Sequence, residues 1–320
     1  MKKILKNVLM SAVIASAAIA TTAAATTTYP DAPVKVIVPY SAGGGSDSVS
    51  RALVEALKDK FPEGIAAENR TGGAGAIGMS YAQNSKPDGR TIGMVAPELV
   101  MLPHQGYGAN LDYKKLIPLA IVNSGYAAIT VPTDSPYKTL EDLIKSSNDN
   151  NLLFGNSGTG SIWYLAGAGL EVQAGTQFTH VPYKGSSAAI TALLGNHLDA
   201  VSVSYAEVAS QVEAGKLRSL AVLAPNRLKD APNVPTAKEL GYDVVIGTWR
   251  GYMVPKGTPQ TTVDFLTDAI LEAVETDTFK TFMANTNNDI EIIKSEQFAN
   301  KLERENIFFK KLITKLELNQ

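Results

Sequence analysis

No other stretch limits the possible folds as strongly as residues 34–47, where an apolar run meets a glycine-rich turn. Val36, Ile37 and Val38 are β-branched and suit a buried strand. Gly43–Gly45 have no Cβ, so their backbone can take unusual angles and come close to a bound group. The pattern predicts a strand, a tight turn and then a helix.

The predicted helix covers Ser48–Lys60. Ser46 or Asp47 can cap it, with its free N–H groups then facing the turn. Such a helix start attracts anions, because unsatisfied N–H groups and the helix dipole both favour negative charge. The unit is therefore a candidate anion site. Which anion this site binds depends on the rest of the chain.

The first 25 residues have the pattern of a secretory signal peptide. Lys2, Lys3 and Lys6 precede an apolar run, Val8–Ala20, that is short for a membrane span, and A-x-A patterns place cleavage near residue 20 or 25. The alternative interpretation of this run is a membrane anchor. The sequence contains no Cys, which excludes disulfides, thiolate metal sites and lipid attachment at a leader cysteine.

Length and charge narrow the class of protein. About 295 residues remain after cleavage, which suits two lobes better than one core. Without the three leader lysines, 26 of the 29 basic residues remain against 31 acidic ones, a net charge of −5. This balance argues against nucleic acid or an anionic membrane surface as a partner. An anionic ligand would need local donors.

Strand-like and helix-like segments alternate along the chain, which predicts an α/β fold with largely parallel sheets. Two apolar runs, Leu116–Asn123 and Tyr126–Val131, are separated by Ser124–Gly125, and a crossing between lobes is expected there. Residues 139–147 are expected to form a helix that begins with a variant capping box, Thr139 with Asp142.

Gly73–Gly78 formally matches the G-x-G-x-x-G pattern of dinucleotide-binding loops, and Glu98 lies at a spacing suited to a ribose-binding acid. The segment before it is not a convincing strand, and the following helix is interrupted early by Pro87. An exported chain would also leave the compartment that holds nicotinamide cofactors. We interpret the segment as a structural glycine loop and expect no cofactor.

Catalysis and metal binding have no support in the sequence. His104, His180 and His197 are scattered and not at metal-ligand spacing, so no metal site is expected. The segment around Ser157 lacks the second glycine of G-x-S-x-G, since Thr159 takes that place. His180 lies in a strand-like run, which favours a hydrogen-bonded packing role.

Small-residue turns with hydroxyl groups recur at three expected strand-to-helix junctions, Ser41–Asp47, Asn156–Ser161 and Tyr183–Ser187. Each can present N–H groups and hydroxyls to a carboxylate. They are either ordinary connecting turns or the parts of a cleft that closes on an acid. The sequence leaves both interpretations open.

Arg250 interrupts an apolar segment near the expected return crossing between lobes. It could fork onto a ligand carboxylate, or it could be an exposed or lobe-bridging ion-pair partner. Asp47 likewise has two possible roles, as a helix cap and as a ligand-orienting group. Four aromatic residues could line a cleft, although aromatic residues in such runs more often belong to the core: Tyr40, Tyr126, Trp163 and Tyr183.

Ordered motifs from Tyr29 almost to the C-terminus make the chain resemble the substrate-binding receptors of tripartite tricarboxylate transporters, the Bug (Bordetella uptake gene) family. The motifs are Tyr29-Pro30, Val38-Pro39-Tyr40, Ala42-Gly43-Gly44-Gly45-Ser46-Asp47, Glu68-Asn69-Arg70, Pro87-Asp88-Gly89, Val181-Pro182-Tyr183-Lys184-Gly185, Pro232-Asn233-Val234-Pro235-Thr236, Trp249-x-Gly251 and Pro255-x-Gly257-Thr258-Pro259.

The resemblance implies a two-lobe periplasmic binding protein of the type II-like, Venus flytrap kind, with two strands crossing between the lobes. We expect residues 1–25 to be the signal peptide, residues 26–126 with 248–320 to form lobe 1, and residues 127–247 to form lobe 2. The implied partners are a small carboxylate and the membrane subunits of a tripartite tricarboxylate-type transporter, with no nucleic acid. The protein is expected to be a monomer in the periplasm.

The resemblance also implies which residues hold the ligand. They are Ala42, Gly44, Ser46 and Asp47 in the first loop, and Gly158, Thr159, Ser161, Lys184 and Gly185 in the second lobe. Tyr40 and Arg250 complete the expected ligand-binding set. Many family members have a His soon after the second glycine turn, where this chain has Ile162-Trp163, so contacts there are expected to differ. The Trp-Arg-Gly variant containing Arg250 resembles tricarboxylate-type members.

The expected function is that of a non-enzymatic receptor that binds a small organic acid, with a di- or tricarboxylate favoured, and delivers it to the transporter. A ligand-sensing receptor for a signalling partner would bind in the same way. A secreted hydrolase on a similar scaffold is the remaining alternative, and it would turn over an ester or amide.

Overall fold

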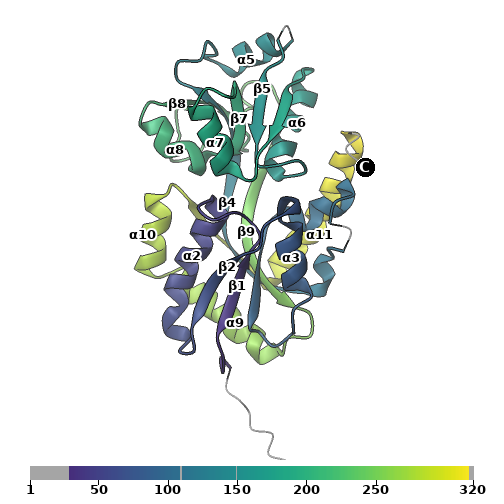
Figure 1. Cartoon of the computed structure of the whole chain (residues 1–320), viewed down its shortest axis with the longest axis vertical. Coiled ribbons are helices and arrows are strands. Elements are labelled where there is room, and N and C mark those ends of the chain that lie inside the picture. The colour runs from purple at the N-terminus through teal and green to yellow at the C-terminus, as the bar shows by residue number, and fades with distance from the viewer. Residues whose placement is uncertain (1–28, 109, 149, 317–320) are drawn as a thin grey trace, which may run out of the picture.

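The computed structural model describes residues 29–108, 110–148 and 150–316. These residues form two lobes, one above the other, joined by two long strands (Figure 1). The predicted signal peptide lies outside the described residues. In the three described ranges, no helix combines the length and the apolar character needed to cross a membrane.

The first lobe is built around the strand that the opening stretch predicted. Its first elements are β1 (Val34–Val38), α2 (Gly45–Leu57), β2 (Ile65–Asn69), α3 (Ala76–Gln83), β3 (Thr91–Val95) and α4 (Glu98–Met101). β1 pairs in parallel with β2 on one side and β3 on the other. The helix begins at Gly45, three residues earlier than predicted, and its N-cap is Gly44. Ser46 and Asp47 therefore lie in the first turn, and the prediction that one of them is the N-cap is wrong.

The second lobe repeats this order of strands and helices. It contains α5 (Leu140–Ser147), β5 (Leu153–Asn156), α6 (Ile162–Ala174), β6 (Thr179–Pro182), α7 (Ser186–Leu194), β7 (Ala200–Ser204), α8 (Tyr205–Glu213) and β8 (Leu217–Val222). β5 pairs in parallel with β6 and β7, as β1 does with β2 and β3. The capping box of Thr139 and Asp142 is confirmed at the start of α5. The helix α8 was not predicted.

The two lobes are connected by β4 (Leu116–Pro132) and β9 (Gly247–Pro255). The two predicted runs are one continuous strand, because Ser124 and Gly125 pair with Trp249 and Thr248 of β9. β4 also pairs with β7 and β8, and β9 with β3, and all of these pairings are antiparallel. The sheets are therefore mixed. The prediction of largely parallel sheets is wrong for β4 and β9, the strands that connect the two lobes.

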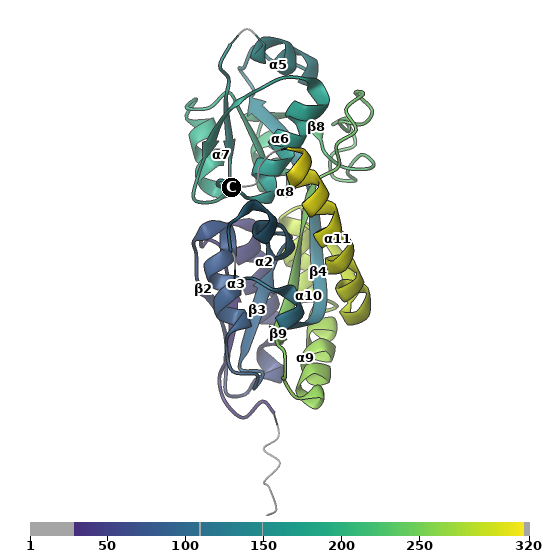
Figure 2. The same cartoon turned by 90° about the vertical axis from the view of Figure 1, so that its right-hand side faces the viewer.

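The C-terminal elements complete the first lobe. They are α9 (Gln260–Ala273), α10 (Asp277–Asn285), β10 (Asp289–Lys294) and α11 (Ser295–Lys315). α10 was not predicted. Along α11, the buried residues Phe298, Leu302, Phe309 and Ile313 recur at helical spacing, so one face packs on the core. The helix runs beside β4 and reaches the level of the second lobe (Figures 1 and 2).

Candidate functional site

A cavity of about 720 Å³ lies between the lobes. All three predicted turns contribute to it, through residues 41–42 and 44–46, residues 157–159 and 161, and residues 183–187. They meet there because each follows the carboxyl end of a strand, and the two lobes present these ends to each other. Residues 71–75 form a fourth part of the wall, and they include the start of Gly73–Gly78, the segment that we interpreted as a structural glycine loop.

Ten of the eleven residues predicted to bind ligand line this cavity. They are Tyr40, Ala42, Gly44, Ser46, Gly158, Thr159, Ser161, Lys184, Gly185 and Arg250. Trp163 and Tyr183 also line it, whereas Tyr126 does not. His180 lies outside the lining and packs against the rings of Phe154 and Tyr164.

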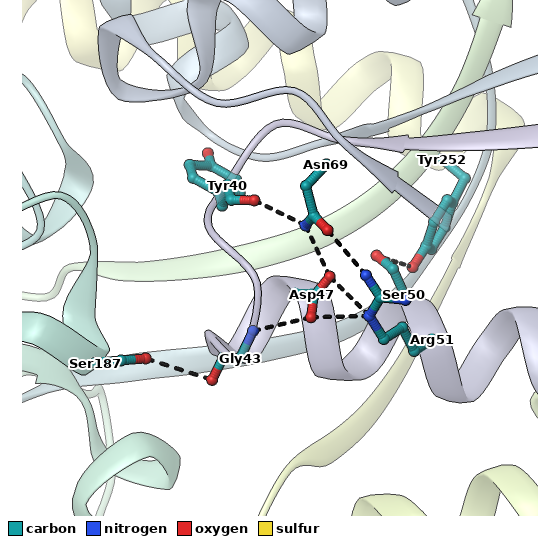
Figure 3. A network of polar contacts seen from close by, with 8 residues as sticks. All are labelled: Tyr40, Gly43, Asp47, Ser50, Arg51, Asn69, Ser187 and Tyr252. Atoms are coloured by element: carbon teal, nitrogen blue, oxygen red, sulfur yellow. Dashed lines mark hydrogen bonds and ion pairs between the residues drawn. The ribbon is translucent and has the colours of Figure 1, made fainter. Parts of the chain in front are cut away.

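Asp47 is the predicted residue that the structure places behind the cavity wall, with 3% of its surface exposed. Its carboxylate accepts from the N–H of Gly43 at 2.9 Å, from Arg51 Nε at 2.9 Å and from Asn69 Nδ2 at 2.8 Å (Figure 3). Asn69 also donates to the Tyr40 carbonyl at 3.0 Å. Asp47 thus ties the glycine turn to α2 and β2, and it supports the loop from behind.

The charge of Asp47 is stabilised by this network. Burial raises the pKa of Asp47, but the hydrogen bonds from Arg51, Gly43 and Asn69 outweigh it and bring the pKa below its usual value. The stabilising effect is therefore present above the unfolded-state pKa of about 3.9 and is lost as the pH falls through the lower folded-state pKa.

Replacing Asp47 by asparagine is expected to lower the free energy of unfolding at pH 7 by about 2 kcal/mol, the scale of a hydrogen-bonded charge. The difference from wild type should shrink as the pH is lowered from 5 towards 2. Urea unfolding over this pH series measures it, with the exposed Asp264→Asn as the matched control. A deficit that does not change with pH would show that the Asp47 charge contributes nothing to the loop.

Arg250 lies on β9, lines the cavity and is 2% exposed. Its Nε donates to the Ser46 hydroxyl at 3.1 Å, and another of its nitrogens donates to the Asn123 side chain of β4. A Cβ on Gly45 would lie 2.7 Å from the guanidinium, so only glycine lets the turn come this close. Burial lowers the pKa of Arg250, yet a guanidinium stays protonated at neutral pH.

No carboxylate within the described ranges forms an ion pair with Arg250. Of the two roles considered for Arg250, that of a lobe-bridging ion-pair partner is therefore not seen in the described residues. Glu207 and Glu98 lie near enough for their charges to raise the pKa of Arg250, but neither is at ion-pair distance, so burial still lowers that pKa overall. An anion entering the cavity could supply the direct ion pair that Arg250 lacks.

The first turn is held in place from two directions. Tyr252 of β9 donates to Ser50 of α2 at 3.0 Å, and burial raises the pKa of this tyrosine to about 12 (Figure 3). Across the cavity, the Ser41 hydroxyl donates to the Lys184 carbonyl at 2.9 Å, and the Ser187 hydroxyl donates to the Gly43 carbonyl at 3.3 Å. The lobes therefore touch at the rim of the cavity.

Two acidic residues in the lining, Glu98 and Glu207, were not assigned to the site from the sequence. Glu98 had been noted only as a ribose-binding candidate, and Glu207 lies in the unpredicted helix α8. Glu98 is 3% exposed and accepts from the Tyr40 hydroxyl at 2.9 Å, so Tyr40 has a specific partner rather than only a packing role. Burial raises the pKa of Glu98, although its hydrogen bonds counteract this.

Comparison with known proteins gives one consistent family. Residues 49–318 match the family described as the tripartite tricarboxylate transporter family receptor. A UPF0065 protein of Cupriavidus necator is 33% identical over 274 residues, which cover 85% of this chain and 83% of that protein.

Among solved structures, a TctC solute-binding protein from Polaromonas without ligand is 38% identical, with a TM-score of 0.70, and the match covers 90% of this chain and all of that one. The periplasmic binding protein BugD is 26% identical, with a TM-score of 0.83, over 91% of this chain and 99% of its own. Two more distant structures from Rhodopseudomonas palustris share the fold: MatC with bound malate, 24% identical with a TM-score of 0.81, and a protein with adipate, 22% identical with a TM-score of 0.84.

Proposed function

Because the chain belongs to the tripartite tricarboxylate transporter receptor family, whose members are solute-binding receptors and not enzymes, we propose that it captures a small dicarboxylate between its lobes and delivers it to a membrane transporter of that type. In this proposal the mature chain works as a monomer in the periplasm. Lobe 1 is formed by residues 26–126 with 248–320, and lobe 2 by residues 127–247.

The observation that carries the proposal is Arg250, a buried cation that lines the cavity and has no carboxylate at ion-pair distance in the described part of the chain. Its planar guanidinium can donate two parallel hydrogen bonds to one carboxylate. Hydroxyl groups of Ser46, Thr159 and Ser161 line the same cavity and can donate to the same ligand.

A second group of donors lies at the start of α7. Its N-cap, Gly185, provides no side-chain cap, and both Ser186 and Ser187 at the first turn line the cavity. The first N–H groups of a helix have no partner within that helix, so they can receive a second carboxylate. Two separate donor groups suit a ligand with an acid at each end.

The charge of the cavity argues against a third carboxylate. Arg250 and Lys184 contribute two positive charges to the lining, and Glu98 and Glu207 contribute two negative ones. The lining has no net positive charge, so each further carboxylate adds repulsion from Glu98 and Glu207, and Arg250 and Lys184 supply at most one cation each for two carboxylates. The malate and adipate found in two proteins of the same fold make dicarboxylates the first probes to use.

The site assignment is tested by replacing Ser46 by alanine together with Thr159 by valine. Each change removes a hydroxyl donor worth about 1.5 kcal/mol to a charged ligand, so the dissociation constant should rise by roughly a hundredfold. Isothermal titration calorimetry with malate and adipate measures it. Ser85→Ala with Thr179→Val, outside the cavity, is the matched control. Unchanged affinity in the cavity variant would refute the assignment of these residues.

A signalling receptor would bind the same ligand, so the two functions differ only in whether the bound acid is delivered to a membrane transporter. We therefore expect ligand uptake in cells to require both this chain and the membrane subunits of the transporter. A chain that binds the acid but is dispensable for uptake would favour the signalling role.

A further inference from the structure

The two lobes place one glutamate each at equivalent positions. In lobe 1, Glu98 lies three residues after the end of β3, and in lobe 2, Glu207 lies three residues after the end of β7. Both strands have five residues and pair in parallel with the first strand of their own lobe. The repeated topology therefore points both side chains at the opposite lobe.

Glu207 reaches the first helix of lobe 1. Its Oε1 accepts from the N–H of Gly45, the first residue of α2, at 3.3 Å. Its Oε2 accepts from the N–H of Ser204, the N-cap of its own helix α8, at 3.2 Å. One half-buried carboxylate thus lies between the N-terminal ends of two helices from different lobes.

Glu98 makes the corresponding contact in the other direction. Its Oε1 accepts from the N–H of Ile162, the first residue of α6, at 3.0 Å. Its Oε2 accepts from the Tyr40 hydroxyl of lobe 1. Ile162 and Gly45 occupy the same place in their lobes, because each opens the helix that follows the first strand.

A carboxylate at a helix N-terminus is stabilised by the helix dipole and by N–H groups that the helix cannot satisfy itself. In the described ranges, the N–H groups of Gly45 and Ile162 each donate to the glutamate of the opposite lobe. We propose that Glu98 and Glu207 are reciprocal positioning residues that hold the two lobes together before a ligand arrives. The bound acid then joins the lobes through Arg250 and α7, and it does not need the N–H groups of Gly45 and Ile162.

The proposal concerns closure of the lobes without ligand, so it can be tested apart from carboxylate binding. The chain has no Cys, which allows spin labels on two introduced cysteines, Ala66→Cys on β2 and Leu194→Cys at the end of α7. Both positions are exposed, and the two elements that carry them, β2 and α7, belong to different lobes (Figure 1). Pulsed electron paramagnetic resonance then gives the populations of short and long distances.

Glutamine keeps the shape of each glutamate and one acceptor but removes the charge. Glu98→Gln and Glu207→Gln should each lower the ratio of closed to open molecules about threefold, and the double variant about tenfold. Amide hydrogen exchange should accelerate at Ile162 in the first variant and at Gly45 in the second. Glu207 is half-buried, so its single variant remains informative if Glu98→Gln folds poorly.

Two matched controls carry the same substitution within one lobe: Glu55→Gln, whose partner is Lys58, and Glu141→Gln, whose partner is Lys145. Neither should change the distance distribution. The proposal is overturned if the folded Glu207→Gln protein keeps the wild-type distances and the wild-type exchange rate at Gly45. Failure of malate or adipate to bind would count against the proposed function and leave this result unaffected.

Discussion

Replacing Arg250 by methionine is expected to raise the dissociation constant for malate or adipate at least about thirtyfold, equivalent to about 2 kcal/mol. Methionine fills a similar volume but cannot donate hydrogen bonds or supply charge. The guanidinium is already desolvated, and Ser46 and Asn123 hold its orientation. Ligand binding therefore carries little entropic cost for ordering this side chain. Calorimetric titration measures the change.

Arg250→Met should change the free energy of unfolding less than it changes the free energy of ligand binding, because removing a buried cation also removes its desolvation cost. Arg218→Met is the matched control, since Arg218 lies outside the cavity and bonds the carbonyls of Thr133 and Tyr137 in its own lobe. Equal affinities of wild type and Arg250→Met would show that the ligand's carboxylate does not contact this residue.

Replacing Gly78 by alanine is expected to lower the free energy of unfolding by about 3 kcal/mol. A Cβ at this position would lie 2.5 Å from the Arg70 carbonyl oxygen and 2.7 Å from the Pro39 Cα. Both are backbone atoms, so they cannot move aside as a side-chain end could. They also belong to the segments that lead from β1 and β2 into the cavity wall, and the strain should therefore weaken ligand binding as well.

Gly169→Ala in α6 provides the matched control. It is another helical glycine, but a Cβ there would meet only side-chain atoms of Val244 and Ile246, at 3.2 Å. The gain in helix propensity, about 1 kcal/mol, should offset this contact. Urea unfolding compares the two variants. If Gly78→Ala is as stable as Gly169→Ala, the close packing of α3 on the loops does not constrain the site.

The sequence was sufficient to predict the parts of the fold that depend on local patterns. The strand Val34–Val38 and the glycine turn after it were confirmed, because β-branched residues and three consecutive glycines leave few alternatives. The three hydroxyl-bearing turns line one cavity, since each follows a strand whose carboxyl end faces the cleft. The antiparallel pairing of β9 with β3 and β4 depends on contacts that no local pattern encodes.

Site residues whose partners are distant in sequence could not be assigned in this way. Asp47 belongs to the predicted loop, but its carboxylate is turned away by Arg51 and by Asn69, which lies on another strand. The two roles considered for Arg250 could be separated only when its neighbours were known. Glu207 was overlooked because its contact with Gly45 joins residues 162 positions apart.

The central claim is that the cavity between the lobes binds a dicarboxylate through its ionised acid groups. Calorimetric titration of the mature protein with malate, adipate and their dimethyl esters tests it most directly, because the ester keeps the carbon skeleton and removes both charges. We predict saturable one-to-one binding of at least one free acid, and binding of its diester at least about a hundredfold weaker. Equal affinity for acid and diester, or no binding of either acid at millimolar concentration, would contradict the claim.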